Sequence, residues 1–309
     1  MKKIFILTGI FIAINLYSFL GSAQTYTLKI EANEQPAQKV ILGTVSGDNF
    51  TPCDSILPKN EVLIFTFPEN SQTGMYRVIF GQTPYARIMN EAPQQLDFIF
   101  NRENIELKTN FKTPLKSIEV VQSEENKLWF AFLMYDDEYR KQFTVLEKEM
   151  DYLWTQKDTL NALEKSNEFN RLQMARDLFI GQNAQQNNTL LAAELISVFR
   201  EPVVDGYLNP TERKNFFQTE FFNTSDFSNE RIVNTSVYTD KIFQYLLTFN
   251  QPGLTQTERE TAYKKAVDTI LDHTNKNEKV YAFICAYLIH GFDVLQMQNL
   301  VNYIHSKAE

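Results

Sequence analysis

Hydrophobic and polar residues alternate at the start of the chain. Tyr26, Leu28 and Ile30 alternate with Thr27 and Lys29, which is the period of a half-buried strand. Similar short runs, bounded by Pro, Gly, Asn or Gln, cover 40–45, 54–56, 61–67, 74–80, 86–89, 96–100 and 105–110, with 117–121 as a last strand or an exit segment. Many short strands at close spacing predict an antiparallel sandwich or barrel over residues 24–122.

The apolar period changes from two to about 3.6 residues near Ser123. From there one stripe of apolar residues extends over many turns: Leu128, Phe132, Tyr135, Tyr139, Phe143, Leu146, Met150 and Leu153. The stripe predicts a long amphipathic helix, with Ser123 as its cap and Glu124 and Glu125 in its first turn. A second helix over 159–180 is expected to pair with it as a hairpin. We therefore interpret the stripe as a packed seam between helices and not as a cofactor groove.

Capping patterns mark the later helices. Residues 209–212 and 255–258 carry a capping residue three positions before a Glu, and 275–278 repeats the pattern. The helix that begins there is expected to stop at Gly291, and a last helix to cover 292–306.

Residues 123–309 are therefore predicted to be all-α. The predicted fold class is α+β, with an N-terminal antiparallel β-sandwich-like domain followed by a helical domain.

The extreme N-terminus has the features of a secretory signal peptide. Lys2 and Lys3 precede an apolar run over 4–20, and Gly21-Ser22-Ala23 places small residues at a cleavage site. The run is too short and too interrupted for a membrane anchor, which needs roughly 20 mostly apolar residues. We expect cleavage after Ala23, which makes residues 1–23 a signal peptide. The mature chain is then exported to the periplasm or cell envelope and has no transmembrane segment.

The net charge and the cysteine content limit the classes of partner that we expect for this protein. The formal net charge is −8, which argues against nucleic acid or anionic lipid as a partner because both need a basic face. The two cysteines, Cys53 and Cys285, lie in different predicted domains and form no C-x-x-C motif. Cys285 lies in an apolar helical run and is expected to be a small buried hydrophobe. Cys53 is too far downstream to carry a lipid anchor at the cleavage point.

No catalytic, cofactor-binding or metal-binding motif is found in the sequence. The three histidines, His273, His290 and His305, have no metal-ligand spacing and are expected near helix ends. The acidic run 136–138 is interpreted as a solvated helix face, because adjacent helical positions point in different directions. Nucleophile-elbow and phosphate-loop motifs are absent from the sequence. The hypothesis that the protein is not an enzyme depends on the absence of these motifs from the sequence. Several ionisable side chains that meet in a dry cleft with displaced pKa values would contradict it.

Two groups of segments carry a resemblance to a known family. The first group is 53–55, 64–67 and 75–78, and the second is 221–231, 234–238 and 241–245. In this order they resemble exported Bacteroidetes thiol:disulfide oxidoreductases of the TlpA/ResA-like kind. The resemblance implies a β-rich domain and a helical domain that precede a thioredoxin-like domain. No C-x-x-C is present here, so the redox activity of the family is not carried over.

The leading functional hypothesis is a non-catalytic, exported cell-envelope protein that binds or scaffolds an unknown protein or envelope ligand. The alternative is an accessory component of periplasmic thiol:disulfide exchange, which uses Cys53 or Cys285 or a separate thioredoxin-like protein. A third hypothesis is a shortened descendant of a longer oxidoreductase. Fold analogy alone does not decide among them.

The tripeptides 54–56, 158–160 and 268–270 resemble the acceptor pattern for O-linked glycans on exported Bacteroidetes proteins. Ser55 is the best candidate acceptor of the three because it is expected in a loop.

The intact mass of the native protein tests the signal-peptide cleavage and the glycan together. We expect a chain that begins at Gln24. A mass equal to the bare mature chain contradicts the glycan, and a mass that retains Met1 contradicts cleavage.

Overall fold

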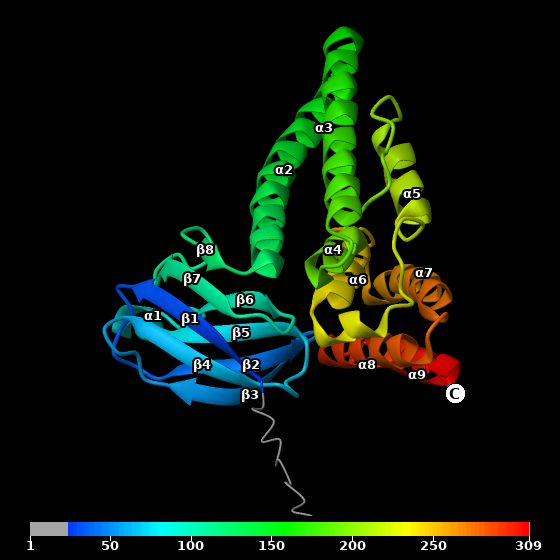
Figure 1. Cartoon of the computed structure of the whole chain (residues 1–309). Coiled ribbons are helices and arrows are strands. Elements are labelled where there is room, and N and C mark those ends of the chain that lie inside the picture. The colour runs from blue at the N-terminus through cyan, green and yellow to red at the C-terminus, as the bar shows by residue number, and fades with distance from the viewer. Residues whose placement is uncertain (1–23, 309) are drawn as a thin grey trace, which may run out of the picture.

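The structure is a computed structural model that describes residues 24–308, so the predicted signal peptide and its cleavage site lie outside the described residues. Two β-sheets form one side of the molecule, and a long helical hairpin projects away from them (Figure 1). Several helices lie beside the base of the hairpin, and α5 lies along its α3 arm (Figure 1). The α+β fold class predicted from the sequence is confirmed, with strands before Ser123 and mainly helices after it.

Eight strands form two four-stranded sheets. Their order is β4-β1-β7-β8 in one sheet and β3-β2-β5-β6 in the other. The strands are β1 Thr25–Asn33, β2 Val40–Ser46, β3 Asn49–Ile56, β4 Val62–Pro68, β5 Gly74–Gly81, β6 Gln94–Phe100, β7 Ile105–Asn110 and β8 Glu119–Gln122. All pairs are antiparallel except β1 with β7, which run parallel, so the first sheet is mixed.

Alternation in the sequence produces the core between the sheets. Leu28 and Ile30 of β1 are fully buried, as their period predicted. Aromatic side chains join the two sheets, since Phe67 of β4 stacks on Phe100 of β6 with ring centroids 4.2 Å apart. Burial of such rings contributes most of the stability of a sandwich core.

One predicted strand is wrong. Residues 86–89 belong to a short helix, α1 Pro84–Ile88, and not to a strand. Thr83 caps this helix by accepting a hydrogen bond from Ala86 N at 3.0 Å. Pro84 occupies the first turn, where its missing N–H costs nothing. The Thr-Pro dipeptide was the signal for a helix start.

The remaining helices follow β8. They are α2 Glu124–Thr155, α3 Thr159–Gln186, α4 Leu191–Val198, α5 Pro210–Glu220, a 3₁₀ turn η1 Glu230–Asn234, α6 Val237–Leu247, α7 Gln256–Thr274, α8 Glu278–Val294 and α9 Gln298–Ala308. The predicted hairpin is formed by α2 and α3. Its seam buries Leu146 and Met150 with Phe169, and Arg176 of α3 lies over the buried ring of Tyr139, so the aromatic stripe is packed as expected.

Helix starts were predicted better than helix ends. Ser123, Asn209 and Thr255 are N-caps, and the last two form complete capping boxes. Helix α8, however, begins after Asn277 and not after Asn275. It also runs past Gly291, because Phe292 continues its buried face and the left-handed residue is Gln296.

Helix α3 also extends beyond its predicted end at residue 180, through Gly181 to Gln186.

The first turn of α2 joins the sheets to the helices. Asn126 is fully buried and acts like an added strand residue beside β6. Its side-chain amide accepts from Ile99 N and donates to Ile99 O, both at 2.8 Å. The carboxylate of the preceding residue, Glu125, accepts hydrogen bonds from the first backbone N–H groups of α4. These are the N–H groups of Leu191 and Ala192, at 3.0 and 2.7 Å. One helical turn therefore fixes α2 against both a sheet edge and a helix N-terminus.

A second junction lies where η1 meets β2 and β5. Gly47 N donates to Thr235 O at 2.9 Å, and Ser46 Oγ donates to Val233 O at 2.8 Å. A Cβ at Gly74 would lie 2.4 Å from Asn234 O, so only glycine fits the approach of these backbones. The two junctions lie on different parts of the sheets and together hold the helices in one orientation.

Replacement of Asn126 tests the first junction. Asn126→Ala leaves a buried N–H and C=O of Ile99 without partners, and we expect a loss of about 2–4 kcal/mol in the free energy of unfolding. Urea unfolding measures it. The adjacent Lys127→Ala, at an exposed site, is the control and is expected to change stability by less than about 0.5 kcal/mol. Equal stability of both variants would contradict the role of Asn126.

Candidate functional site

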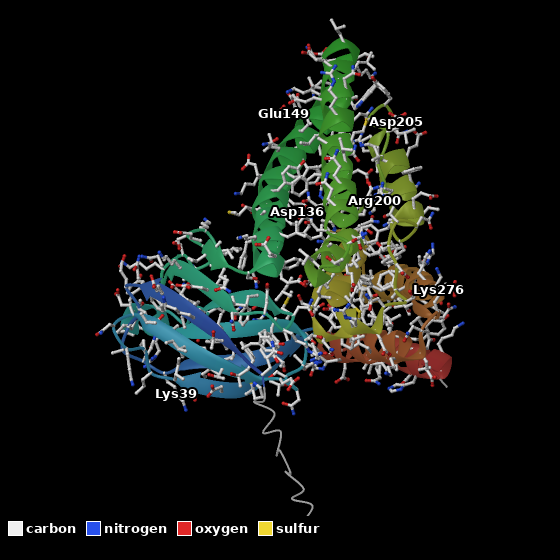
Figure 2. The ribbon with its side chains drawn as sticks, viewed as in Figure 1. Lys39, Asp136, Glu149, Arg200, Asp205 and Lys276 are labelled. Carbon is white, nitrogen blue, oxygen red and sulfur yellow. The ribbon has the colours of Figure 1, made fainter. Side chains whose placement is uncertain are left out.

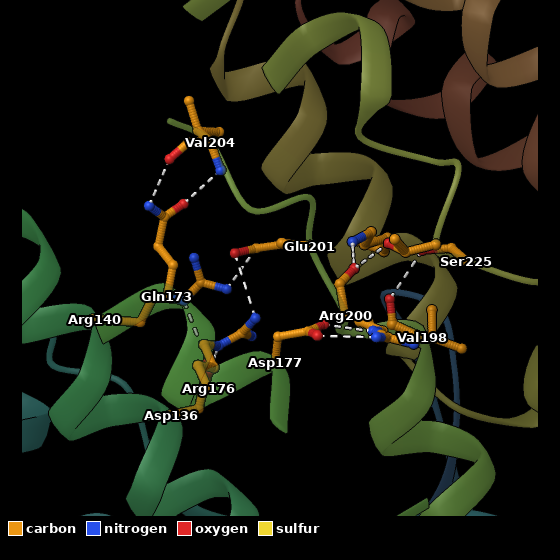
Figure 3. Close-up of polar contacts among 12 residues, drawn as sticks. Asp136, Arg140, Gln173, Arg176, Asp177, Val198, Arg200, Glu201, Val204 and Ser225 are labelled. Carbon is orange, nitrogen blue, oxygen red and sulfur yellow. Dashed lines mark hydrogen bonds and ion pairs between the residues drawn. The ribbon is translucent and has the colours of Figure 1, made fainter. Parts of the chain in front are cut away.

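Four charged side chains meet inside the helical part of the molecule. This ion network consists of Asp136 and Arg140 on α2, Arg176 on α3 and Glu201 after α4. Arg176 donates to Asp136 at 2.6 Å and lies 3.4 Å from Glu201, while Arg140 donates to Glu201 at 2.6 Å (Figure 3). Asp136 lies in the lower part of the hairpin, with Arg200 near the same level (Figure 2). The network thus ties both hairpin arms to the segment after α4.

Burial makes the pairing in the ion network strong. The side chain of Arg176 is 3% exposed and that of Glu201 is 9% exposed. Burial acts to raise the pKa of Glu201, but the positive charges of Arg140 and Arg176 outweigh it and hold that pKa below its ordinary value. Glu201 is therefore ionised, and the network is held together by charge-assisted hydrogen bonds.

Lys241 of α6 lies beside the ion network and is fully buried. Its ammonium donates to Arg200 O at 2.6 Å and lies 4.1 Å from the ring centroid of Phe221. Burial lowers the pKa of Lys241 from 10.5 to about 7, and the opposing effect of Glu201 is smaller. The sequence contained a signal for this, because Val237, Lys241 and Tyr245 fall at i, i+4 and i+8 on one face of α6.

The ion network corrects the interpretation of the acidic run. Asp137 and Glu138 are exposed as expected, whereas the side chain of Asp136 is 17% exposed and pairs with two arginines. Ionisable side chains from distant segments therefore do meet in a site shielded from water. Such a site, if it were a cleft open to substrate, would contradict the hypothesis of a non-enzyme. Lys241, the group with the most displaced pKa, is however sealed from solvent, so no substrate reaches it in this conformation.

An open groove of about 580 Å³ lies next to the ion network. It is bounded by α2, α3, α5, α6 and the segment after α4. Its charged residues are Arg140, Glu147, Asp151, Glu201, Arg213 and Lys214, and its apolar residues include Phe143, Phe169, Phe217, Phe221 and Leu247. Aromatic walls with a few polar groups are typical of ligand-binding sites.

An ion pair lies at each end of the part of α2 that lines the groove. At one end Arg213 of α5 pairs with Asp151 of α2, and at the other Arg140 pairs with Glu201. Glu147 lies between them on α2, one turn from Asp151. It forms no hydrogen bond or ion pair with any residue in 24–308. Burial, and then the negative charge of Asp151, raise the pKa of Glu147.

Two more polar groups of the groove lack partners. Arg213 is 4% exposed; it donates to Leu208 O at 2.7 Å, but its Nε has no acceptor among the described residues. Gln244 Oε1 on α6 is likewise buried without a donor within residues 24–308. An unmet buried group costs about 1–3 kcal/mol unless water or a ligand pairs with it. Arg176 Nη2, in the ion network beside the groove, is a further buried donor without an acceptor among the described residues.

The structure does not bring the residues named from the sequence into one site. Cys53 is exposed in β3 and Cys285 is buried in α8, and both thiols are free. His273 and His305 lie in last helical turns as expected, but His290 lies before the last turn of α8, exposed beside an apolar hollow. Within residues 24–308 no group of three or more His, Cys, Asp or Glu side chains is placed to hold a metal.

Ser55 lies in strand β3 and not in a loop. It is half-buried and paired in register with Ile41 at the edge of its sheet. The expectation of a loop there was wrong, because β3 accommodates the 52–54 stretch with a bulge at Cys53, opposite Leu42 and Gly43 of the neighbouring strand.

Comparisons of the chain with family models, with curated proteins and with solved structures found no match. Of the helices in the described part of the chain, none is long and apolar enough to span a bilayer. The groove therefore has to be interpreted from its own chemistry.

The buried lysine gives a pH dependence. Because the folded-state pKa of Lys241 is about 7 and the ordinary value is 10.5, the unfolded chain binds more protons between these values, and stability rises with pH there. We expect the free energy of unfolding to rise from about pH 7 to pH 9.5, by at most about 1.4 kcal/mol per pH unit. Lys241→Met is expected to lose this slope, whereas the exposed Lys276→Met keeps it. Identical slopes in all three proteins would contradict the assignment.

Proposed function

We propose that this protein is an exported, non-catalytic module that binds a segment of a partner in the groove between the hairpin and α5. The observation that carries the proposal is the groove itself, an open site lined by aromatic and charged residues in which the half-buried carboxyl of Glu147 has no partner among residues 24–308. Gln244 Oε1 and Arg213 Nε are buried in its walls without partners in the same residues. A ligand in the groove can supply the hydrogen bonds that Glu147 lacks.

The shape of the groove suits an extended peptide. Arg140 and Asp151 lie eleven positions apart on one helix, so the groove runs for roughly 16 Å along α2. An extended chain advances about 3.3 Å per residue, so four or five residues fit this length. Phe143 and Phe217, which are half-buried, line the walls where apolar side chains of the segment would lie.

The chemistry of the groove supports binding over catalysis. General acid–base or nucleophilic catalysis needs a reactive group and a partner that activates it at hydrogen-bond distance. Glu147 has no such partner among residues 24–308, and the hydroxyl of Thr248 donates to Tyr245 O at 2.7 Å. The charged pairs at the two ends are bound to each other. The groups of the groove are therefore suited to binding a ligand and not to catalysing its reaction.

Export and localisation rest on the sequence. The charged start, short apolar run and small residues before Gln24 support secretion into the periplasm or cell envelope. The resemblance to the first two domains of TlpA/ResA-like oxidoreductases supports a role beside other envelope proteins. A separate thioredoxin-like protein is one candidate for the partner.

The alternative is an accessory role in thiol:disulfide exchange. Cys53 is the thiol that a partner could reach, because β3 lies at the edge of its sheet and Cys53 is exposed. Burial, and then the charge of Asp54, raise the pKa of the Cys53 thiol, and burial raises that of Cys285. Both shifts reduce the thiolate fraction that exchange needs. The separate partner would therefore supply the redox chemistry.

A bulky substitution in the groove tests the proposal. Leu247 is 50% exposed in the groove, and Leu160 is 80% exposed near the far end of the hairpin. We expect Leu247→Trp to reduce the capture of partners from envelope extract at least about tenfold, whereas the matched Leu160→Trp leaves capture unchanged. Quantitative mass spectrometry of the captured proteins measures the difference. Equal capture by both variants, or turnover of a substrate that depends on one side chain, would contradict the proposal.

A further inference from the structure

We infer that the middle of the groove binds a cation on an apolar stem, that is, the ammonium or guanidinium of a Lys or Arg side chain in the partner segment. This inference rests on the proposed function, since it names the ligand of the same groove. The charges along the groove, the unmet acceptors and the aromatic walls each support it.

The first argument is the isolated carboxyl of Glu147. The guanidinium of Arg213 is engaged with Asp151 and Leu208 O, and that of Arg140 with Glu201 and Asp136. Neither arginine binds Glu147. Burial and the charge of Asp151 act against the ionised form of Glu147, and Arg213, whose charge favours that form, is already paired with Asp151. A ligand cation placed there would form the ion pair that no residue in 24–308 forms with Glu147.

The second argument is the buried oxygen of Gln244. Oε1 of Gln244 is an acceptor without a donor in the described chain, and it lies in the wall of the groove that α6 forms. Glu147 of α2 and Gln244 of α6 line the same groove, but Gln244 Oε1 is covered and is reached only when its side chain turns toward the groove. An ammonium has three donors and a guanidinium five, so a cation bound to the Glu147 carboxylate keeps donors for that amide oxygen.

The third argument is the aromatic lining. Phe143 and Phe217 line the groove with Glu147 and offer ring faces to a methylene stem and its charge. The protein already uses such contacts on both sides of the site: Arg213 lies 5.8 Å from the ring centroid of Phe169, and Lys241 lies 4.1 Å from that of Phe221. A bound cation would occupy the same type of environment.

An anionic ligand fits this position less well. The one cation of the groove without a carboxylate partner among residues 24–308 is Lys214 of α5, which is half-buried. An anion drawn to Lys214 would face the carboxyls of Glu147, Asp151 and Glu201 in the same groove. No element bounding the groove adds a further positive group, since α3 contributes Phe169 and α6 contributes Gln244, Leu247 and Thr248.

The pH dependence of binding follows from the same groups. A bound cation stabilises the ionised form of Glu147, so binding competes with protonation of that carboxyl. Because burial and Asp151 raise the pKa of Glu147 in the free protein, the affinity is expected to fall as the pH is lowered through that raised value. The ammonium or guanidinium of the ligand stays charged over this range.

Three acetylated peptide amides, Phe-Lys-Leu, Phe-norleucine-Leu and Phe-Glu-Leu, test the inference by calorimetry with the full-length protein. They share the apolar side chains and differ in charge at the centre. We expect the lysine peptide to bind on the order of 10- to 100-fold more tightly than the other two. Glu147→Gln is expected to reduce its affinity to that of the norleucine peptide. Glu138→Gln, the same change at an exposed site of α2 outside the groove, is the control and is expected to change nothing.

Each other outcome overturns the inference. Tighter binding of the glutamate peptide means an anionic ligand, and unchanged affinity in Glu147→Gln means that the carboxyl is not the contact. Absence of binding by all three peptides at millimolar concentration also counts against it. In these cases the loss of partner capture in Leu247→Trp, at a residue that lines both the groove and the apolar hollow beside His290, still tests partner binding on its own, so the two proposals fail separately.

Discussion

The ion network of Asp136, Arg140, Arg176 and Glu201 is the constraint on which the arrangement of the helices depends. Each of its members is partly or fully removed from water, and each has an opposite charge at hydrogen-bond distance. Removing one partner would leave a buried charge uncompensated, which is far more costly than the net contribution of the intact pairs. The network therefore allows few positions of α2 and α3 relative to the segment after α4.

The groove follows from this constraint. The hairpin arms are fixed at their base by the ion network and by the contacts of Asn126 and Glu125, while α5 lies along the upper part and is joined to α2 by Arg213 and Asp151. The space between the two fixed pairs is left open, with Glu147 as a carboxyl that forms no hydrogen bond or ion pair within the described chain. A site of this kind is preorganised, because its charges are already in position before a ligand binds.

Local patterns allowed much of the fold to be predicted from sequence. Alternation identified β1, and capping side chains located the starts of α2, α5 and α7, because both signals depend on a few adjacent residues. One failure, the strand expected at 86–89, missed the local start signal of α1 at Thr83-Pro84. Another came where a distant contact decided the outcome. Gly291 would end an isolated helix, but burial of Phe292 keeps α8 intact.

The site was not predictable in the same way. Asp136, Arg176, Glu201 and Lys241 come from four separate segments, and only their tertiary packing brings them together. The single local indication was a lysine on the apolar face of α6. Glu147 gave no indication, since a Glu on a long amphipathic helix resembles any solvated residue until α5 covers it.

Hydrogen exchange of the whole protein with and without the lysine peptide tests the central claim most directly. The account predicts slower exchange in α5 and in the parts of α2 and α6 that border the groove, with exchange of the β-sheets and of α9 unchanged. Protection centred on the sheets, on the exposed edge around Cys53 or on the apolar hollow beside His290 would place binding elsewhere and contradict the account.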